Sequence, residues 1–135
     1  MKIYLAKSNK CSPSDYMRVR NALISENVEI LEHTGGTYNH SKLLSADKLI
    51  VLPEKVGMPC TLGRGLYEQI LAFISSNREC YLVTNADNLL AVKIDEKKIS
   101  VRNPLDWSMY AHYDDQETPR TMIASLVPFK YYIIL

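Results

Sequence analysis

A glycine-rich turn followed by a glutamate is the part of the sequence best suited to chemistry. It reads Thr61-Leu62-Gly63-Arg64-Gly65-Leu66-Tyr67-Glu68 and lies at the start of an expected helix. Glycines at such a start let a ligand approach the backbone N–H groups, where the helix dipole favours anions. A carboxylate about one turn further on is suited to attack a sugar carbon or stabilise an oxocarbenium-like centre. We therefore take Glu68 as a candidate catalytic residue and Gly63, Arg64 and Gly65 as candidate substrate-binding residues. An ordinary helix start with a solvated glutamate would give the same spacing.

Three further residues stand where a neighbouring pocket could use them. Asp47 comes immediately before the apolar run Leu-Ile-Val-Leu, and Tyr4 lies in the first apolar segment. Ser8 belongs to the segment Lys7–Lys10, which follows that first segment. Ligands of open α/β sheets bind beyond the carboxyl ends of the strands, so Ser8 is a candidate binding residue. Asp47 and Tyr4 are candidate site residues, but an aspartate at this position is more typical of a turn, and Tyr4 equally suits a core tyrosine.

A loop with two histidines offers weaker chemistry. Gly35-Gly36-Thr37 is suited to hold a phosphate through backbone N–H groups, but it is more typical of a plain turn. His33 and His40 flank it, but neither has a carboxylate or thiol at ligand spacing. We expect no metal site and no cofactor.

The elements that must position these residues follow a strand–helix alternation in the first two thirds of the chain. Strands are expected at Ile3–Ala6, Val28–Leu31, Lys48–Pro53 and Cys80–Val83. Helices are expected after Ser12-Pro13-Ser14-Asp15, within Ser41–Ala46 and over Thr61–Ser76. This order predicts an α/β fold with a flavodoxin-like or Rossmann-like, mostly parallel sheet flanked by helices.

The rest of the chain predicts an addition to that sheet. Leu89–Ile94 and Ile99–Val101 flank a charged turn and are typical of a β-hairpin. Asn103–Glu117 is expected to be loop, Thr118–Leu126 a short helix and Tyr131–Leu135 a terminal strand. No internal repeat interrupts the 135 residues, which are expected to form one domain.

Composition limits the class of partner that the protein can bind. The net charge is +1 and no basic stripe is present, so we expect a small-molecule or protein partner and no polymeric nucleic acid. The three cysteines suit reduced thiols in a cytoplasmic protein. The first apolar run is too short for a signal peptide, and no apolar stretch is long enough to span a membrane.

Taken together, these motifs resemble the nucleoside 2-deoxyribosyltransferase-like superfamily. The resemblance rests on Lys2-Ile3-Tyr4-Leu5-Ala6, on Ser45-Ala46-Asp47 before the third strand, and on the glycine turn leading to Glu68. Pro59-Cys60-Thr61-Leu62-Gly63-Arg64-Gly65 is similar to the turn of the 2′-deoxynucleoside 5′-monophosphate N-hydrolase branch. The similarity covers about residues 1–84.

The resemblance implies a role for each candidate. Glu68 would be the nucleophile at the anomeric carbon, Asp47 would bind or protonate the leaving base, and Tyr4 would orient Glu68. The backbone of Gly63–Gly65 would lie near the sugar or phosphate, and the protein would form a homodimer or larger assembly. Transferases often carry an aspartate just before the glycine turn, where this chain has Cys60-Thr61-Leu62.

Three functions follow as expectations. The first is an N-glycosidase that cleaves the base–sugar bond of a nucleoside or nucleoside 5′-monophosphate, by hydrolysis or by deoxyribosyl transfer. The second is a catalytically inactive nucleotide-binding or interaction module of the same fold. The third is cleavage of nicotinamide from NAD through a helix-borne glutamate, as in the similar Toll/interleukin-receptor-like folds.

Overall fold

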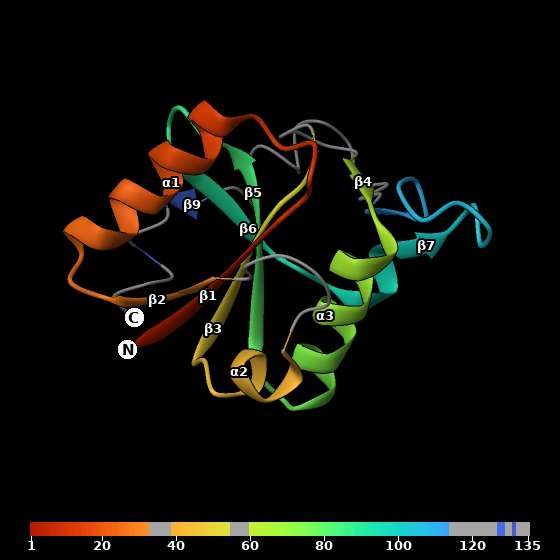
Figure 1. Cartoon of the computed structure of the whole chain (residues 1–135), viewed down its shortest axis with the longest axis horizontal. Helices are drawn as coiled ribbons and strands as arrows, with labels where there is room; N and C mark the ends of the chain where they lie inside the picture. Colours follow the sequence, from red (N-terminus) through yellow and green to blue (C-terminus); the bar gives the residue numbers. More distant parts are fainter. Residues whose placement is uncertain (33–38, 55–59, 114–126, 129–130, 132–135) are drawn as a thin grey trace.

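A computed structural model describes residues 1–32, 39–54, 60–113, 127–128 and 131. The fold is α/β, with helices on both faces of a mixed, mostly parallel sheet and a small antiparallel sheet beside it (Figure 1). The strand order of the main sheet is β2-β1-β3-β5-β6-β9, and that of the small sheet is β4-β8-β7. The predicted α/β class and mostly parallel sheet are thus confirmed.

Four parallel strands, from the edge strand β2 to β5, form one side of the main sheet, and each contains a short apolar run. They are β1 (Lys2–Lys7), β2 (Glu29–Glu32), β3 (Lys48–Leu52) and β5 (Glu79–Asn85). β1 pairs in parallel with both β2 and β3, and β3 pairs in parallel with β5. β6 (Leu90–Lys93) and β9 (Val127–Pro128) complete the sheet with antiparallel pairing.

The two long helices have clear sequence boundaries. α1 (Pro13–Ser25) is capped by Ser12, whose hydroxyl accepts the N–H of Asp15, and has proline in its first turn. α3 (Arg64–Ser75) follows Gly63, which occupies its N-cap position. A left-handed asparagine follows each helix, with φ of 60° at Asn27 and 58° at Asn77, because asparagine tolerates this conformation. A short third helix, α2 (His40–Leu44), is capped by the side chain of Asn39.

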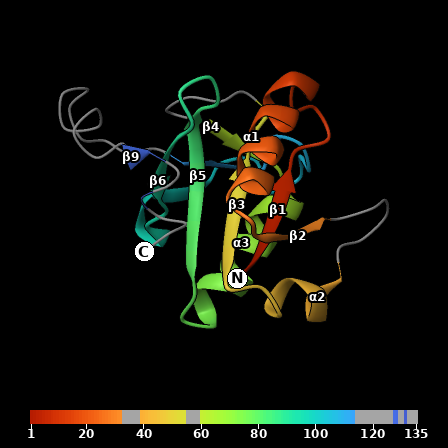
Figure 2. The ribbon, with the colours of Figure 1, turned by 90° about the vertical axis from the view of Figure 1, so that its left-hand side faces the viewer.

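The helices divide the core between the two faces of the sheet. α1 packs on one face of the main sheet and α3 on the opposite face, as Figure 2 shows. Alternate residues of β3 point to opposite faces of the sheet, because successive side chains along a strand alternate in direction. Leu49 and Val51 pack with Leu66 and Ile70 of α3, whereas the α1 side is a second cluster. That cluster includes Ile50, Leu52, Val19 and Leu23.

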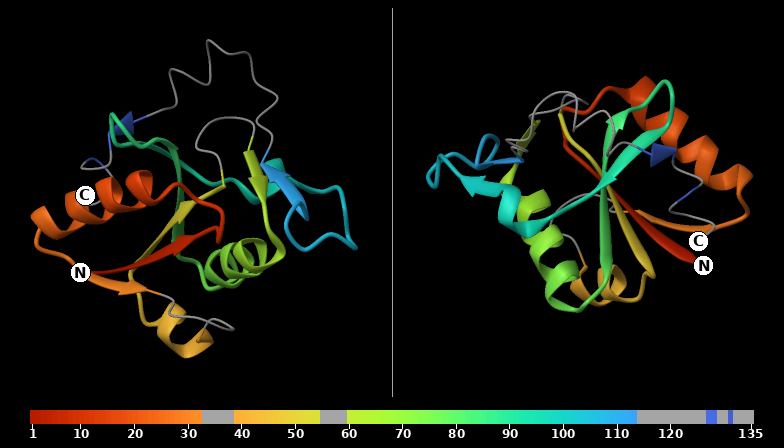
Figure 3. Two further views of the ribbon diagram at one scale, coloured as in Figure 1. Left: turned by 45° about the horizontal axis from the view of Figure 1, so that its top comes forward. Right: turned by 180° about the vertical axis from the view of Figure 1, so that it is seen from behind.

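The small sheet packs on the α3 side of the molecule, away from α1 (Figure 3). It consists of β4 (Cys60–Leu62), β7 (Ile99–Val101) and β8 (Ala111–Tyr113). β8 lies in the middle and pairs antiparallel with both neighbours. The segment between β7 and β8, residues 102–110, projects from this sheet and is here named the 102–110 loop.

Three predictions for these segments were wrong. The strands expected to form one hairpin lie in different sheets, since β6 pairs with β5 while β7 pairs with β8. A 3₁₀ helix, Glu96–Lys98, capped by the Asp95 side chain, separates them and redirects the chain. Part of the expected loop Asn103–Glu117 is strand β8, and the first residues of the expected helix Thr61–Ser76 form β4.

The remaining sequence predictions lie partly or wholly outside the described residues. These are the glycine loop at 35–37 with His33, the helix at 118–126, and most of the strand at 131–135. Within the described part, no helix has both the length and the apolar character needed to cross a bilayer.

Candidate functional site

The amino-terminal end of α3 is joined to the 102–110 loop. The N–H of Arg64 donates to the carbonyl oxygen of Trp107 at 2.8 Å. A Cβ on Gly63 would lie 3.2 Å from that same oxygen, so the loop's approach favours glycine there. A Cβ on Gly65 would meet nothing within 4 Å. One N–H group predicted to face a ligand is therefore used within the protein, while the space beside Gly65 is open.

Arg64 also makes the main side-chain contacts of this region. Its Nε lies 3.0 Å from Oε1 of Glu68, which is one helical turn further along α3. Its guanidinium lies 4.5 Å from the ring centroid of Trp107 and 5.4 Å from that of Tyr110. Both distances are in the range of cation–π contacts. Arg64 therefore links the candidate nucleophile to the loop.

Three aromatic rings extend from α3 across to the loop. The Tyr67 and Tyr110 rings lie 5.3 Å apart, centroid to centroid, at an interplanar angle of 52°. The side chain of Trp107 is large and apolar, yet the residue is 64% exposed. We name Tyr67, Trp107 and Tyr110 the aromatic shelf. An exposed tryptophan beside an arginine offers a flat surface on which a nucleobase can stack.

The position of the shelf depends on a turn organised by Asp106. Its Oδ1 accepts the N–H and hydroxyl of Ser108, both at 2.9 Å, and the N–H of Met109 at 3.2 Å. These hydrogen bonds, the Ser108 hydroxyl first, lower the pKa of the Asp106 carboxyl below its ordinary value. Asn103 adds a bond from its side-chain amide to the Met109 carbonyl, at 3.1 Å.

Glu68 is held in place on one side and open to solvent on the other. It shares the outer side of α3 with Arg64 and Tyr67, because residues three and four apart lie on one helix face. Its side chain is 44% exposed, and Arg64 supplies the contact that orients the carboxylate. A carboxylate in this arrangement can approach a ligand that lies on the aromatic shelf.

Two other candidates lie in β1 and directly after it. Tyr4 is fully buried in the centre of β1, in the cluster that also contains Leu66 of α3. Ser8 follows β1 directly, and its N–H donates to the carbonyl oxygen of Leu52 at 2.9 Å. Ser8 therefore lies at the carboxyl ends of the adjacent strands β1 and β3.

Asp47 does not join these residues. It precedes β3 at the amino-terminal end of the sheet, where its Oδ2 accepts the N–H of Lys2 at 2.8 Å. Arg78, beyond the end of α3, donates to the Ala46 carbonyl at 2.6 Å, so Asp47 lies near the carboxyl end of that helix. Glu68 precedes Ser75 at that end by seven residues, about 10 Å at 1.5 Å per residue.

Sequence reasoning did not select Gln69, although the structure makes it unusual. Its side chain is buried, its Nε2 donates to the Gly65 carbonyl at 3.2 Å, and its Oε1 meets no donor among the described residues. The available signal was the helical spacing, since Gln69 interrupts the apolar stripe of Leu66, Ile70 and Phe73. Trp107 and Tyr110 are far from Glu68 in sequence, so spacing gave no signal for them.

The described residues give no evidence for a metal site or for a reactive thiol at Cys60 or Cys80. Within the ranges that the structure describes, no three histidine, cysteine or acidic residues come together as a metal site. Burial raises the pKa of the Cys60 thiol to about 12 and that of Cys80 well above its ordinary value. Neither cysteine therefore suits a nucleophile at neutral pH.

Comparisons with family models, curated proteins and solved structures returned no match for this chain.

Proposed function

We propose that this protein is an N-glycosidase that cleaves the base–sugar bond of a nucleoside or nucleoside 5′-monophosphate, with Glu68 as nucleophile. The observation that carries the proposal is the position of Glu68. It stands on the outer side of α3, oriented by Arg64 at 3.0 Å, next to an aromatic shelf that includes a 64% exposed tryptophan.

The strand order supports a ligand site at this end of the sheet. Counted along the chain, the parallel strands β2-β1-β3-β5 have the order 2-1-3-4, which is the order of flavodoxin-like sheets. Such sheets bind ligands where the order reverses, beyond the carboxyl ends of the first and third strands. Ser8 lies at that point and is assigned to the sugar or phosphate.

The reaction proceeds in two steps. An oxygen of Glu68 attacks the anomeric carbon while the carbon–nitrogen bond breaks, and the base leaves with the bonding electrons and takes a proton from water. A water molecule, which gives its proton to the hydroxide left by the first step, then attacks the same carbon, releases the carboxylate and completes hydrolysis. Transfer to a second base would replace this water. Asp47, at the far end of α3, has no part in the proposed site.

The aromatic shelf gives the base a binding surface. Arg64 supports the Trp107 ring through its guanidinium, and the exposed part of the indole is available to the ligand. Stacking of a base on an aromatic side chain contributes about 1–3 kcal/mol and does not depend strongly on which base is present. The shelf would therefore bind several bases.

The test is release of free base. The protein is incubated with nucleosides, their 5′-monophosphates, the 2′-deoxy forms and NAD, and the products are separated by chromatography. We expect release from at least one nucleoside or monophosphate, and loss of at least a thousandfold in Glu68→Gln. Glu96→Gln, on the exposed 3₁₀ helix, is the matched control. No release by the wild-type protein, or equal release by Glu68→Gln, would refute the proposal.

One observation favours an inactive nucleotide-binding module as the second candidate. Arg64 forms an ion pair with the carboxylate that would have to attack, and Asp47 lies elsewhere. In that case, calorimetry would detect binding of a nucleoside monophosphate without release of base, and Trp107→Ala would weaken the binding.

A further inference from the structure

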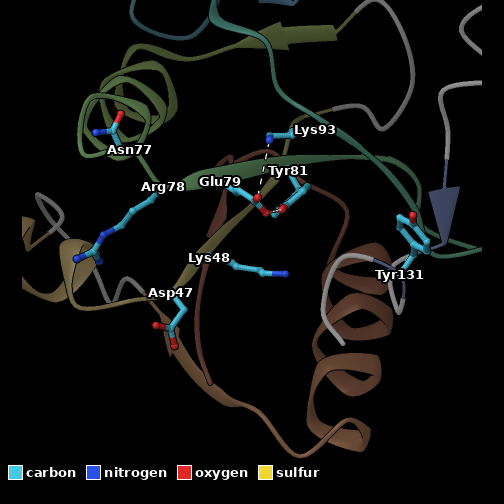
Figure 4. A pocket seen from close by; sticks show the side chains of 8 residues that line it. All are labelled: Asp47, Lys48, Asn77, Arg78, Glu79, Tyr81, Lys93 and Tyr131. Atoms are coloured by element: carbon cyan, nitrogen blue, oxygen red, sulfur yellow. Dashed lines mark hydrogen bonds and ion pairs between the residues drawn. The ribbon is translucent and has the colours of Figure 1, made fainter. Parts of the chain in front are cut away.

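A hollow of about 500 Å³ opens at the amino-terminal end of the main sheet. Figure 4 shows its lining, which consists of Asp47, Lys48, Asn77, Arg78, Glu79, Tyr81, Lys93 and Tyr131. It lies on the α1 side of the sheet, since Tyr81 belongs to the cluster that packs against α1. Small-molecule sites commonly have this volume, and a nucleotide-sized ligand would fit.

The strand register brings four of these side chains together as two cross-strand pairs, and we name this group of four residues the square. Lys48 of β3 is directly opposite Glu79 of β5, and Tyr81 of β5 is directly opposite Lys93 of β6. Glu79 and Tyr81 are two residues apart on one strand, so all four side chains share one face. Three adjacent strands therefore present two lysines, one glutamate and one tyrosine to the hollow.

The contacts within the square leave one lysine without an anionic partner. Nζ of Lys93 lies 3.7 Å from Oε1 of Glu79, and the Tyr81 hydroxyl donates to the other oxygen of that carboxylate. Nζ of Lys48 lies 5.6 Å from the Tyr81 ring centroid. Among the described residues, no carboxylate forms an ion pair with Lys48. The square therefore carries a net charge of +1.

The other charged groups of the lining do not cancel this charge. Asp47 accepts the backbone N–H of Lys2, and Arg78 donates to the carbonyl oxygens of Leu44 and Ala46. In Figure 4 both side chains point away from Lys48 and Tyr81, and Tyr131 lies on the opposite side of the hollow. The hollow thus combines two ammonium groups and the Glu79 carboxylate with the rings of Tyr81 and Tyr131, and its centre keeps a net positive charge.

We propose that this hollow binds a phosphorylated small molecule of nucleotide size. Lys48 and Lys93 hold the phosphate, because ammonium groups form short, charge-assisted hydrogen bonds to phosphate oxygens. The organic part of the ligand lies against Tyr131. This site is independent of the glycosidase proposal, because Glu68 and the aromatic shelf lie at the other end of α3.

The experiment is a titration of the ¹⁵N-labelled full chain with adenosine 5′-monophosphate, inorganic phosphate and adenosine. Glu68→Gln protein is used so that the nucleotide stays intact. We expect amide shifts at Lys48, Glu79–Tyr81 and Lys93, and tighter binding of the monophosphate than of either fragment. Lys48→Gln and, separately, Lys93→Gln are each expected to weaken its affinity about tenfold.

The matched control is Lys97→Gln, an exposed lysine on the 3₁₀ helix, which should change the affinity less than twofold. Circular dichroism confirms that each variant is folded. Shifts confined to the Gly63–Glu68 region would overturn the proposal. So would equal affinities of Lys48→Gln, Lys93→Gln and Lys97→Gln, or equal binding of inorganic phosphate and the monophosphate.

Discussion

At the scale of single residues, Arg64 is held by several contacts within the protein, so its side chain is not free to bind a ligand directly. Its backbone N–H holds the Trp107 carbonyl, while its guanidinium contacts Glu68 and two aromatic rings. The sequence suggested that Arg64 binds substrate directly. The structure supports a positioning role, in which Arg64 orients both Glu68 and the aromatic shelf.

Replacing Arg64 by glutamine tests this role. The backbone hydrogen bond remains, but the ion pair and the cation–π contacts are lost, so the free energy of unfolding should fall by about 1 kcal/mol. Fluorescence of Trp107, the single tryptophan of the chain, should also change. Denaturant unfolding and emission spectra measure the two effects. Unchanged stability and emission would show that Arg64 does not position the loop.

Gln69 is the second residue with an unexpected environment. Its buried Oε1 lacks a donor among the described residues, and a buried acceptor in that state is unfavourable. Gln69→Met removes the acceptor at similar volume and should raise the free energy of unfolding by about 1 kcal/mol. A loss of more than 1 kcal/mol in denaturant unfolding would instead show that the amide has a stabilising partner.

At the scale of elements, the 102–110 loop depends on the carboxylate of Asp106. Its hydrogen bonds lower the pKa below the ordinary value of 3.8, so their stabilising effect is present above that value. The effect is lost as the pH falls through the lowered pKa. Emission of Trp107 should therefore stay constant from pH 8 to about pH 5 and change in more acidic solution.

The control for this titration is Asp106→Asn, whose side-chain oxygen accepts the same bonds but does not titrate. This variant should lose the acid-dependent change, while Asp106→Ala should show altered emission at every pH. Far-UV circular dichroism separates the local change from unfolding. The same acid titration in Asp106→Asn and wild type would contradict the assignment to Asp106.

The elements also show what local sequence could predict. α1 was predicted from its local cap and α3 from its local apolar spacing, and the parallel strands were predicted because their apolar runs are short and distinct. The partners of β6 and β7 were mispredicted, since alternation marks a strand but not its neighbour. β4 and β8 have three residues each, too few for a periodic signal.

The contacts of the candidate site likewise fall into those that local sequence could predict and those that depend on tertiary structure. Arg64 and Glu68 are four residues apart on one helix, so their contact follows from helical geometry. The contact of Arg64 with Trp107 depends on how β7, β8 and the loop fold onto α3, which is tertiary information. The position of Asp47 at the opposite end of the sheet from Ser8 likewise depends on strand direction and register.

At the scale of the whole molecule, the sheet separates two regions with different chemistry. Glu68, Arg64 and the aromatic shelf lie where α3 begins, on the side of the small sheet. The hollow with Lys48 and Lys93 lies at the amino-terminal end of the main sheet, on the α1 side. Because different strands and helices form them, substitutions in one should leave ligand binding at the other intact.

The central claim is that Glu68 forms a covalent bond with the sugar, and a slowed substrate tests it most directly. A nucleoside 5′-monophosphate with fluorine at the 2′ position destabilises the oxocarbenium-like transition states, so the glycosyl–enzyme should accumulate. Intact-mass and peptide mass spectrometry should find one added fluorinated sugar phosphate, attached to Glu68. The label should persist in Glu96→Gln and be absent from Glu68→Gln. Attachment to another residue, or base release without any label, would contradict the proposal.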